Sequence, residues 1–207
     1  MANQVEIINL ALSHIGIAPI ASISEASVQA QTAMRCWDSA RKESLRGHDW
    51  AFATVVATLS YSTTLATLTT SGLYAGEWVY AYQYPSNCVA MWHLYNEVTE
   101  NKDLGEEFRE IYDAVNSQKV LVSNCVDALG EYTFDVTDPS FYDANFVTMF
   151  SYRLAADLAM PLTGDPNLSV TMMKVFNELM NDAERMSAYE NNPGKQTNES
   201  SRFIDAR

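Results

Sequence analysis

The side chains that most often carry chemistry are sparse in this sequence and lie far apart. The three histidines are His14, His48 and His93, and none has a second ligand at the short spacing of a metal motif. No P-loop, dinucleotide-binding, nucleophile-elbow or Cys-x-x-Cys pattern is present. The sequence therefore predicts no metal site, no cofactor and no catalytic residue, and we do not expect an enzyme.

One adjacent pair, His48 and Asp49, could be read as an acid–base pair beside Trp50. Neighbouring residues at the end of a helix rarely point at one reacting atom, and that geometry is the first requirement for general acid–base catalysis. We therefore interpret the pair as a polar helix terminus. An acidic hydrolase is accordingly the least favoured function.

The composition is that of a folded protein with reduced thiols. Of the 207 residues, 47% are hydrophobic, and no run of eighteen apolar residues could span a membrane. Cys36, Cys88 and Cys125 are odd in number and widely spaced, and the N-terminus lacks the basic and apolar segments of a secretory signal. We expect three free cysteines in a protein made in the cytosol.

Net charge limits the partners that the surface can hold. The chain has 26 acidic and 13 basic residues, a formal net charge of −13. Proteins that grip DNA or RNA neutralise phosphates with a basic face, and anionic membranes are likewise repelled by an acidic surface. Tight nucleic-acid binding and membrane binding are both disfavoured.

The elements that position these residues begin with two helices. Residues 1–23 read as a helix, which Gly16 ends, followed by a turn. The long helix that follows opens at Ser24, which can cap it, and closes at Gly47, the residue type that ends helices in the left-handed conformation. Trp37 is the largest apolar side chain on its buried face.

Residues 50–137 favour strands. Threonine and β-branched residues dominate its first part, and a strict alternation follows that places Trp78, Tyr80, Tyr82 and Tyr84 on one face. Within this region, the acidic residues 97–116 show apolar side chains at helical spacing, which predicts a short surface helix.

Two helices close the chain, and both have the same start signal. Asp138-Pro139 and Asp165-Pro166 each place a capping residue before a proline at the first helical position. The predicted fold class is therefore α+β: a bundle of about four helices with a β-rich insertion and an extended C-terminal arm. The predicted domains are a helical bundle (1–49 and 138–191), the β-rich insertion with its acidic helix (50–137) and a flexible docking arm (192–207).

Three sets of residues are candidate interaction surfaces. The aromatic face of residues 78–84 could pack in its own chain, contact another subunit, or stack on a sugar. Basic side chains on the polar side of the long helix face an acidic region of a neighbouring subunit in our interpretation. They are Arg35, Lys42 and Arg46.

The third set lies in the C-terminal arm. Arg202, Phe203 and Ile204 place an apolar pair near the end of a polar, aperiodic segment. Such a segment becomes ordered when a partner offers a groove, although a frayed terminus has the same composition.

Read together and in order, several motifs resemble the head-to-tail adaptor family of tailed bacteriophages, of the tail tubular protein A type. The matching segments are ALSHIGIAPIAS, ARKESLRGHDWAFA, YQYPSNCVAMWHL, YTFDVTDPSFYDANFVTMFSYRLAADLAMPLTGDPNL and NDAERMSAYENN. They cover nearly the whole chain. The chain departs from the family at Tyr84-Pro85-Ser86-Asn87 and lacks the arginine that often follows there, so a contact made by that arginine is not expected.

The resemblance implies a structural virion protein of the phage tail or neck, assembled in the host cytoplasm. It implies a ring of copies of this chain, a dodecamer, that joins the portal protein above to the tail nozzle protein below, with tail fibres as further candidate partners. It also implies a channel through which DNA passes at ejection without specific binding, which agrees with the acidic composition. In this assembly the arm would bind the portal, and the aromatic face would contact another subunit or the nozzle.

Two alternatives stay open. One is a neck or tail-completion protein of a long-tailed phage, with the same fold and a different lower partner. The other is a soluble module that binds a carbohydrate or a peptide on the aromatic face of the strand around Tyr80 and Tyr82.

Overall fold

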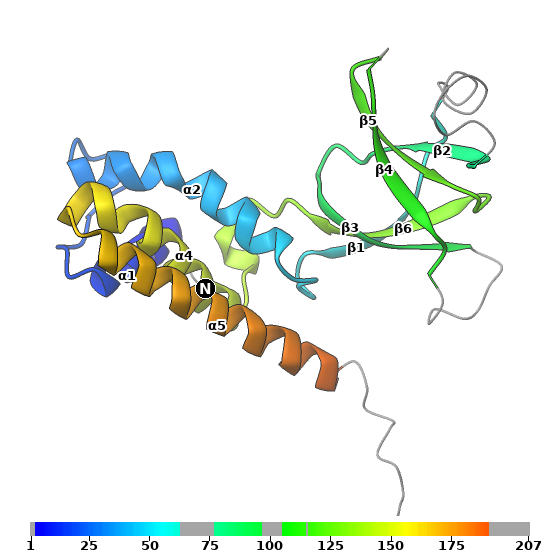
Figure 1. The fold of residues 1–207 in the computed structure, drawn as a ribbon. Coiled ribbons are helices and arrows are strands. Elements are labelled where there is room, and N and C mark those ends of the chain that lie inside the picture. Colours follow the sequence, from blue (N-terminus) through cyan, green and yellow to red (C-terminus); the bar gives the residue numbers. More distant parts are fainter. Residues whose placement is uncertain (1–2, 63–76, 97–104, 115, 191–207) are drawn as a thin grey trace, which may run out of the picture.

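The fold is α+β, as the sequence predicts (Figure 1). The computed structural model describes residues 3–62, 77–96, 105–114 and 116–190. The helices are α1 (Gln4–His14), α2 (Val28–Arg46), α4 (Ala144–Thr163) and α5 (Pro166–Glu190), with a 3₁₀ turn, η1 (Pro139–Phe141). The strands are β1 (Thr54–Thr58), β2 (Tyr80–Gln83), β3 (Cys88–Asn96), β4 (Phe108–Asp113), β5 (Gln118–Ser123) and β6 (Ala128–Phe134).

Capping side chains set where α1 and α2 begin. Asn3 and Glu6 form a reciprocal capping box at the start of α1. The cap of α2 is Ser27, whose hydroxyl oxygen accepts from the Ala30 N–H at 3.2 Å, and not Ser24. The prediction was wrong here because Glu25 accepts from the Ala21 N–H at 2.8 Å, which stabilises the turn before the helix instead of its first turn.

Gly47 ends α2 in a way that the sequence did not predict. Its φ is −73° and its ψ is −21°, so the predicted left-handed conformation is absent. Space explains the glycine instead: an added Cβ would lie 2.3 Å from the Cε atom of Met180 on α5. Gly164, which ends α4 at φ +73°, has the left-handed conformation.

The two Asp-Pro signals have different outcomes. Asp165 accepts from the Asn167 N–H at 2.8 Å and α5 begins at the following proline, as predicted. Asp138 caps only η1, and α4 begins five residues later with Asp143 as its cap, accepting from the Phe146 N–H at 2.6 Å. The proline signal is therefore correct for a turn but wrong for the start of α4.

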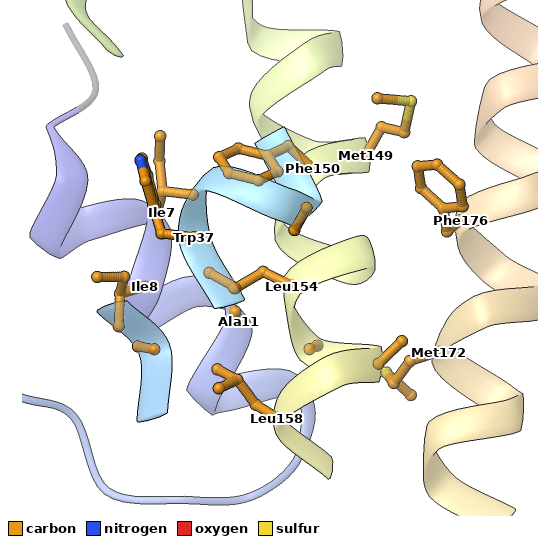
Figure 2. Close-up of a cluster of buried hydrophobic side chains, with 14 of the residues drawn as sticks. Ile7, Ile8, Ala11, Trp37, Met149, Phe150, Leu154, Leu158, Met172 and Phe176 are labelled. Atoms are coloured by element: carbon orange, nitrogen blue, oxygen red, sulfur yellow. The ribbon is translucent and has the colours of Figure 1, made fainter. Parts of the chain in front are cut away.

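The core of the bundle lies around α4, which packs against α1, α2 and α5 (Figure 2). Trp37 on α2 meets Phe150 on α4 edge to face, with ring centroids 4.8 Å apart. Phe176 on α5 lies on the other side of α4, next to Met149 in the view of Figure 2. The apolar stripes of α1, α2 and α5 therefore all pack against α4.

The β part consists of two three-stranded antiparallel sheets. One has the order β1-β6-β3 and the other β2-β5-β4. Their facing sides enclose a cluster that includes Tyr82, Leu94 and Leu121, each completely buried. A smaller cluster on the other face of the second sheet contains Trp78, Ala81 and Val122.

The predicted acidic helix over residues 97–116 is wrong where it is described, because β4 occupies Phe108–Asp113. Phe108 packs against the cluster between the sheets, while Ile111 packs against Trp78 on the opposite face. Their three-residue spacing suits one face of a helix, but it also suits the two faces of a strand when both are covered. Residues 97–104 and 115 lie outside the described residues, as do 63–76 of the predicted threonine-rich strand region.

Candidate functional site

A buried ion pair connects the bundle to the β part. Arg41 on α2 is 2% exposed and donates to the Asp135 carboxylate, to the Val136 carbonyl at 3.1 Å and weakly to Asp38 at 3.5 Å. Burial alone would lower the pKa of Arg41, but the hydrogen bond and charge of Asp135 outweigh it and raise that pKa. Arg41 therefore stays charged and holds the segment that returns from β6 to the bundle.

Further hydrogen bonds support the same joint. Arg46 donates to the Val89 carbonyl at 3.1 Å, and the Trp50 indole donates to the Ser44 carbonyl at 3.1 Å. The Phe134 N–H donates to the Ala53 carbonyl at 2.7 Å, so the chain segments that leave and re-enter the bundle lie side by side. These contacts fix the β part at one end of α2.

Titratable side chains gather on the β-part side of this joint. His93 on β3 lies 3.4 Å from the Glu131 carboxylate on β6, and the Tyr95 hydroxyl donates to the same carboxylate. Burial raises the pKa of Asp49; the charge of nearby Glu131 adds to this, and His48 and His93 oppose it. His48 and Asp49 thus belong to a wider polar cluster and are not an isolated pair.

This cluster does not have the geometry of a metal centre. Over the described ranges of the chain, no group of three or more His, Cys, Asp or Glu side chains is placed to hold a metal ion. His14 is elsewhere: it lies 3.0 Å from the Ser151 hydroxyl and stacks on Tyr152 at 3.9 Å, and burial lowers its pKa. None of the described helices is both long enough and apolar enough to cross a membrane.

The aromatic face packs largely within the chain. Tyr82 is completely buried, and its hydroxyl donates to the Cys125 carbonyl. Tyr84 donates to Glu110 at 3.3 Å and lies beneath the Lys119 ammonium, 3.9 Å from its ring centroid. Tyr80 is half-buried against the same cluster. Of the three alternatives given for the aromatic face, the contacts of Tyr80, Tyr82 and Tyr84 agree with packing within the chain.

Trp78 departs from the predicted face. It precedes β2 and lies in the cluster with Ala81, on the opposite side of the sheet from Tyr82. It is 7% exposed. The expectation that Trp78 and Tyr82 contact another protein is therefore corrected, because both side chains are already buried in this chain.

Three basic side chains of α2 face solvent, in contrast to the buried Arg41. Arg35 and Arg46 are exposed, and Lys42 is exposed with its ammonium 3.8 Å from Asp135. Apolar neighbours share this exposure, since Val28 is 66% and Met34 42% exposed. The outer side of α2 thus combines exposed cations and apolar side chains with two exposed acids, Asp38 and Glu43. The candidate portal-docking residues Arg202, Phe203 and Ile204 lie outside the described residues.

An open cleft of about 270 Å³ lies where β1 and β2 end. Its walls are uncharged, and they combine two aromatic rings and a proline with hydroxyl and amide groups. The lining residues are Ala57, Thr58, Leu59, Ser60, Gln83, Tyr84, Pro85, Ser86 and Tyr132.

No family model matches the chain. No curated protein matches it either. The function of this chain is therefore inferred from its residues and their arrangement.

Sequence reasoning missed the partners of the two buried arginines. Arg153 on α4 is 8% exposed and donates to Asp157 at 2.5 Å and to Glu43 on α2 at 2.6 Å. Arg41 lies on the apolar face of α2 in the sequence, which signals a buried cation and hence an acidic partner. Nothing local to Asp135 identifies it as that partner, because 94 positions separate the two residues.

Proposed function

We propose that this chain is a non-enzymatic subunit of a ring-shaped phage connector, which joins the portal to the tail nozzle. The observation that carries the proposal is the arrangement of one helical bundle interrupted by a β part. That is the arrangement that the resemblance to head-to-tail adaptors implies. The absence of a metal cluster in the described regions and the sparse chemistry of the sequence are compatible with it.

The charge distribution supports contact between copies. A net charge of −13 would keep copies apart unless a local basic surface meets an acidic one. Exposed Arg35 and Lys42 supply cations for such a contact on α2, next to exposed Met34 and the exposed carboxylate of Asp38. Interfaces commonly combine an apolar centre with a polar rim. We therefore assign the outer side of α2 to the neighbouring subunit.

The ring is tested by electron microscopy of the chain with and without portal rings. We expect dodecameric rings on the portal and monomers alone, because the polar segment 192–207 would bind only a partner. Deleting residues 193–207 should leave the melting temperature unchanged and abolish attachment to the portal. Stable rings without portal, or attachment of the truncated chain, would contradict this part of the proposal.

The α2 surface is tested by charge reversal. Arg35→Glu with Lys42→Glu should abolish ring formation and leave the circular dichroism spectrum unchanged, because both side chains are exposed. Lys174→Glu with Arg185→Glu is the matched control on α5: both residues are exposed, and the net charge changes equally. Loss of rings in both variants would indicate a general charge effect and not an α2 interface.

A further inference from the structure

The outer edge of β1 has free backbone hydrogen-bonding groups. The Leu59 N–H donates to the Ala128 carbonyl at 2.9 Å, and the Phe134 N–H donates to Ala53. In an antiparallel pair of strands, every second residue forms hydrogen bonds to the partner strand. These two bonds show which residues of β1 bond to β6, and the N–H and C=O groups of Val56 and Thr58 are among those that point away from β6. Within the described residues, none of these four groups has a hydrogen-bond partner.

The other edges of the two sheets differ from this one. Ser60–Ser62 cover β2, with the Gln83 N–H donating to Ser60 and the Ser62 N–H to Ala81, each at 2.8 Å. Two register shifts interrupt β3, and β4 carries charged side chains along its length. Bulges and edge charges are the usual devices that prevent strand addition. β1, with the sequence TVVAT, has neither device.

The cleft begins where this edge ends. Thr58 contributes to both, and Tyr84, Pro85 and Tyr132 form apolar walls beyond it. Val56, 55% exposed, lies two residues before Thr58 and on the opposite face of the sheet from Val55 and its partner Tyr132, so alternate side chains of an added strand would point to the Val56 face and to the cleft face. An extended chain paired with β1 would therefore pass Val56 and reach the cleft with a following side chain.

We propose that β1 binds an extended segment of another protein as an added strand, with one apolar side chain of that segment in the cleft. The backbone bonds would give affinity and the cleft would give side-chain preference, which is how strand addition works elsewhere. The net charge of the chain indicates which kind of segment would bind there. The edge and the cleft are uncharged and the whole chain carries −13, so a neutral or basic segment is favoured over a second copy of this chain. The inference does not depend on the connector role.

The probe is a capped nonapeptide, KTVTFTVTK, labelled with fluorescein and titrated with the full chain in an anisotropy assay. Versions with Ile, Ala or Glu in place of the central Phe test the cleft, and affinity should fall in that order. A version N-methylated through its central five residues keeps the side chains and cannot pair with β1; it should bind at least tenfold more weakly. In ¹⁵N spectra, the Val56 and Thr58 amides should show the largest shifts and slowed exchange.

Val56→Pro is the decisive variant. It removes an outward N–H while the bonds from β6 to neighbouring residues remain, and an edge position is where strands tolerate proline. We expect at least a tenfold loss of affinity. Val56→Lys, which keeps the N–H and adds a charge, provides a second test with less backbone strain and should weaken binding in the same direction. Val79→Lys is its control, because Val79 is 58% exposed elsewhere in the β part.

Several results would overturn the proposal. One is the absence of binding by all four peptides at 1 mM, and another is equal binding of the N-methylated peptide. Amide shifts centred away from β1 would also contradict it. A dimer that Val56→Lys dissolves would identify a second copy as the occupant. Tighter peptide binding after deletion of residues 191–207 would identify the chain's own terminus. Either outcome would replace the proposed partner.

Discussion

In the bundle, α4 is surrounded by α1, α2 and α5, whereas each sheet of the β part is only three strands wide. The bundle has one continuous cluster of buried side chains, whose large members include Trp37, Phe146 and Phe150. The β part divides its apolar residues between two smaller clusters and buries hydroxyl groups such as that of Tyr82. The bundle thus depends on packing, and the β part depends more on hydrogen bonds to backbone.

The largest effect should come from the bundle core. Phe150→Ala removes a completely buried ring and should lower the free energy of unfolding by about 4 kcal/mol, as large-to-small core changes do. Leu121→Ala, also completely buried, is the counterpart in the β part and should cost about 3 kcal/mol. Urea unfolding followed by hydrogen exchange measures each part separately.

If the bundle and the β part are stabilised separately, each substitution should destabilise mainly its own part. Phe150→Ala should accelerate amide exchange in the helices more than in the strands, and Leu121→Ala should do the reverse. Uniform acceleration in both variants would indicate that the chain unfolds as one unit. Val170→Ala, at a position 55% exposed on α5, is the control and should change stability by less than about 0.5 kcal/mol.

An effect smaller than that of Phe150→Ala, and similar to that of Leu121→Ala, is expected at the joint between the parts. Arg41→Met leaves the Asp135 carboxylate without its buried partner and should cost about 3 kcal/mol. The exchange of strand and helix amides should become less coupled, because the link from α2 to residue 135 is lost. Arg185→Met removes an exposed pair with Asp182 and should cost at most about 0.5 kcal/mol in the same urea titration.

The smallest effect concerns pH at the joint. Burial raises the pKa of Asp49 in the folded protein, so the protonated carboxyl is favoured there. Its contribution to stability is therefore complete below the unfolded pKa, near 4, and is lost as pH rises through the folded value. Asp49→Asn should make the protein more stable than the wild type at pH 7, with the difference vanishing towards pH 4. Thermal melts across this range measure the difference; a variant less stable at pH 7 would contradict the assignment.

The sequence was a good guide to the helices because each has an apolar stripe at helical spacing and a start or stop signal. Gly164 and Asp165 illustrate this at the turn between α4 and α5. It failed over Phe108–Asp113, where both faces of a strand are covered and the resulting pattern resembles a helix. Ser24 and Ser27 both satisfy the rule for a helix cap, so the rule alone does not distinguish them.

The joint could be anticipated only in part. A basic residue on the apolar face of α2 predicts a buried cation, but Asp135 becomes its partner only after the β part has folded. The unprotected edge of β1 was equally hidden, because edge and centre strands have similar compositions. Which strand lies at an edge depends on pairing between β1 and β6, which are remote in the sequence.

The side-by-side entry and exit of the β part has a consequence for the order of folding. Contacts between α2 and α4 require residues 47–143 to form a closed loop, and closing a long loop is entropically unfavourable. Once β1 pairs with β6, Thr54 lies opposite Thr133 and the loop that remains to be closed is roughly fivefold shorter. A shortening of that size is worth about 1.5 kcal/mol of chain entropy. The β part, when formed first, would thus act as a template that brings α2 and α4 together.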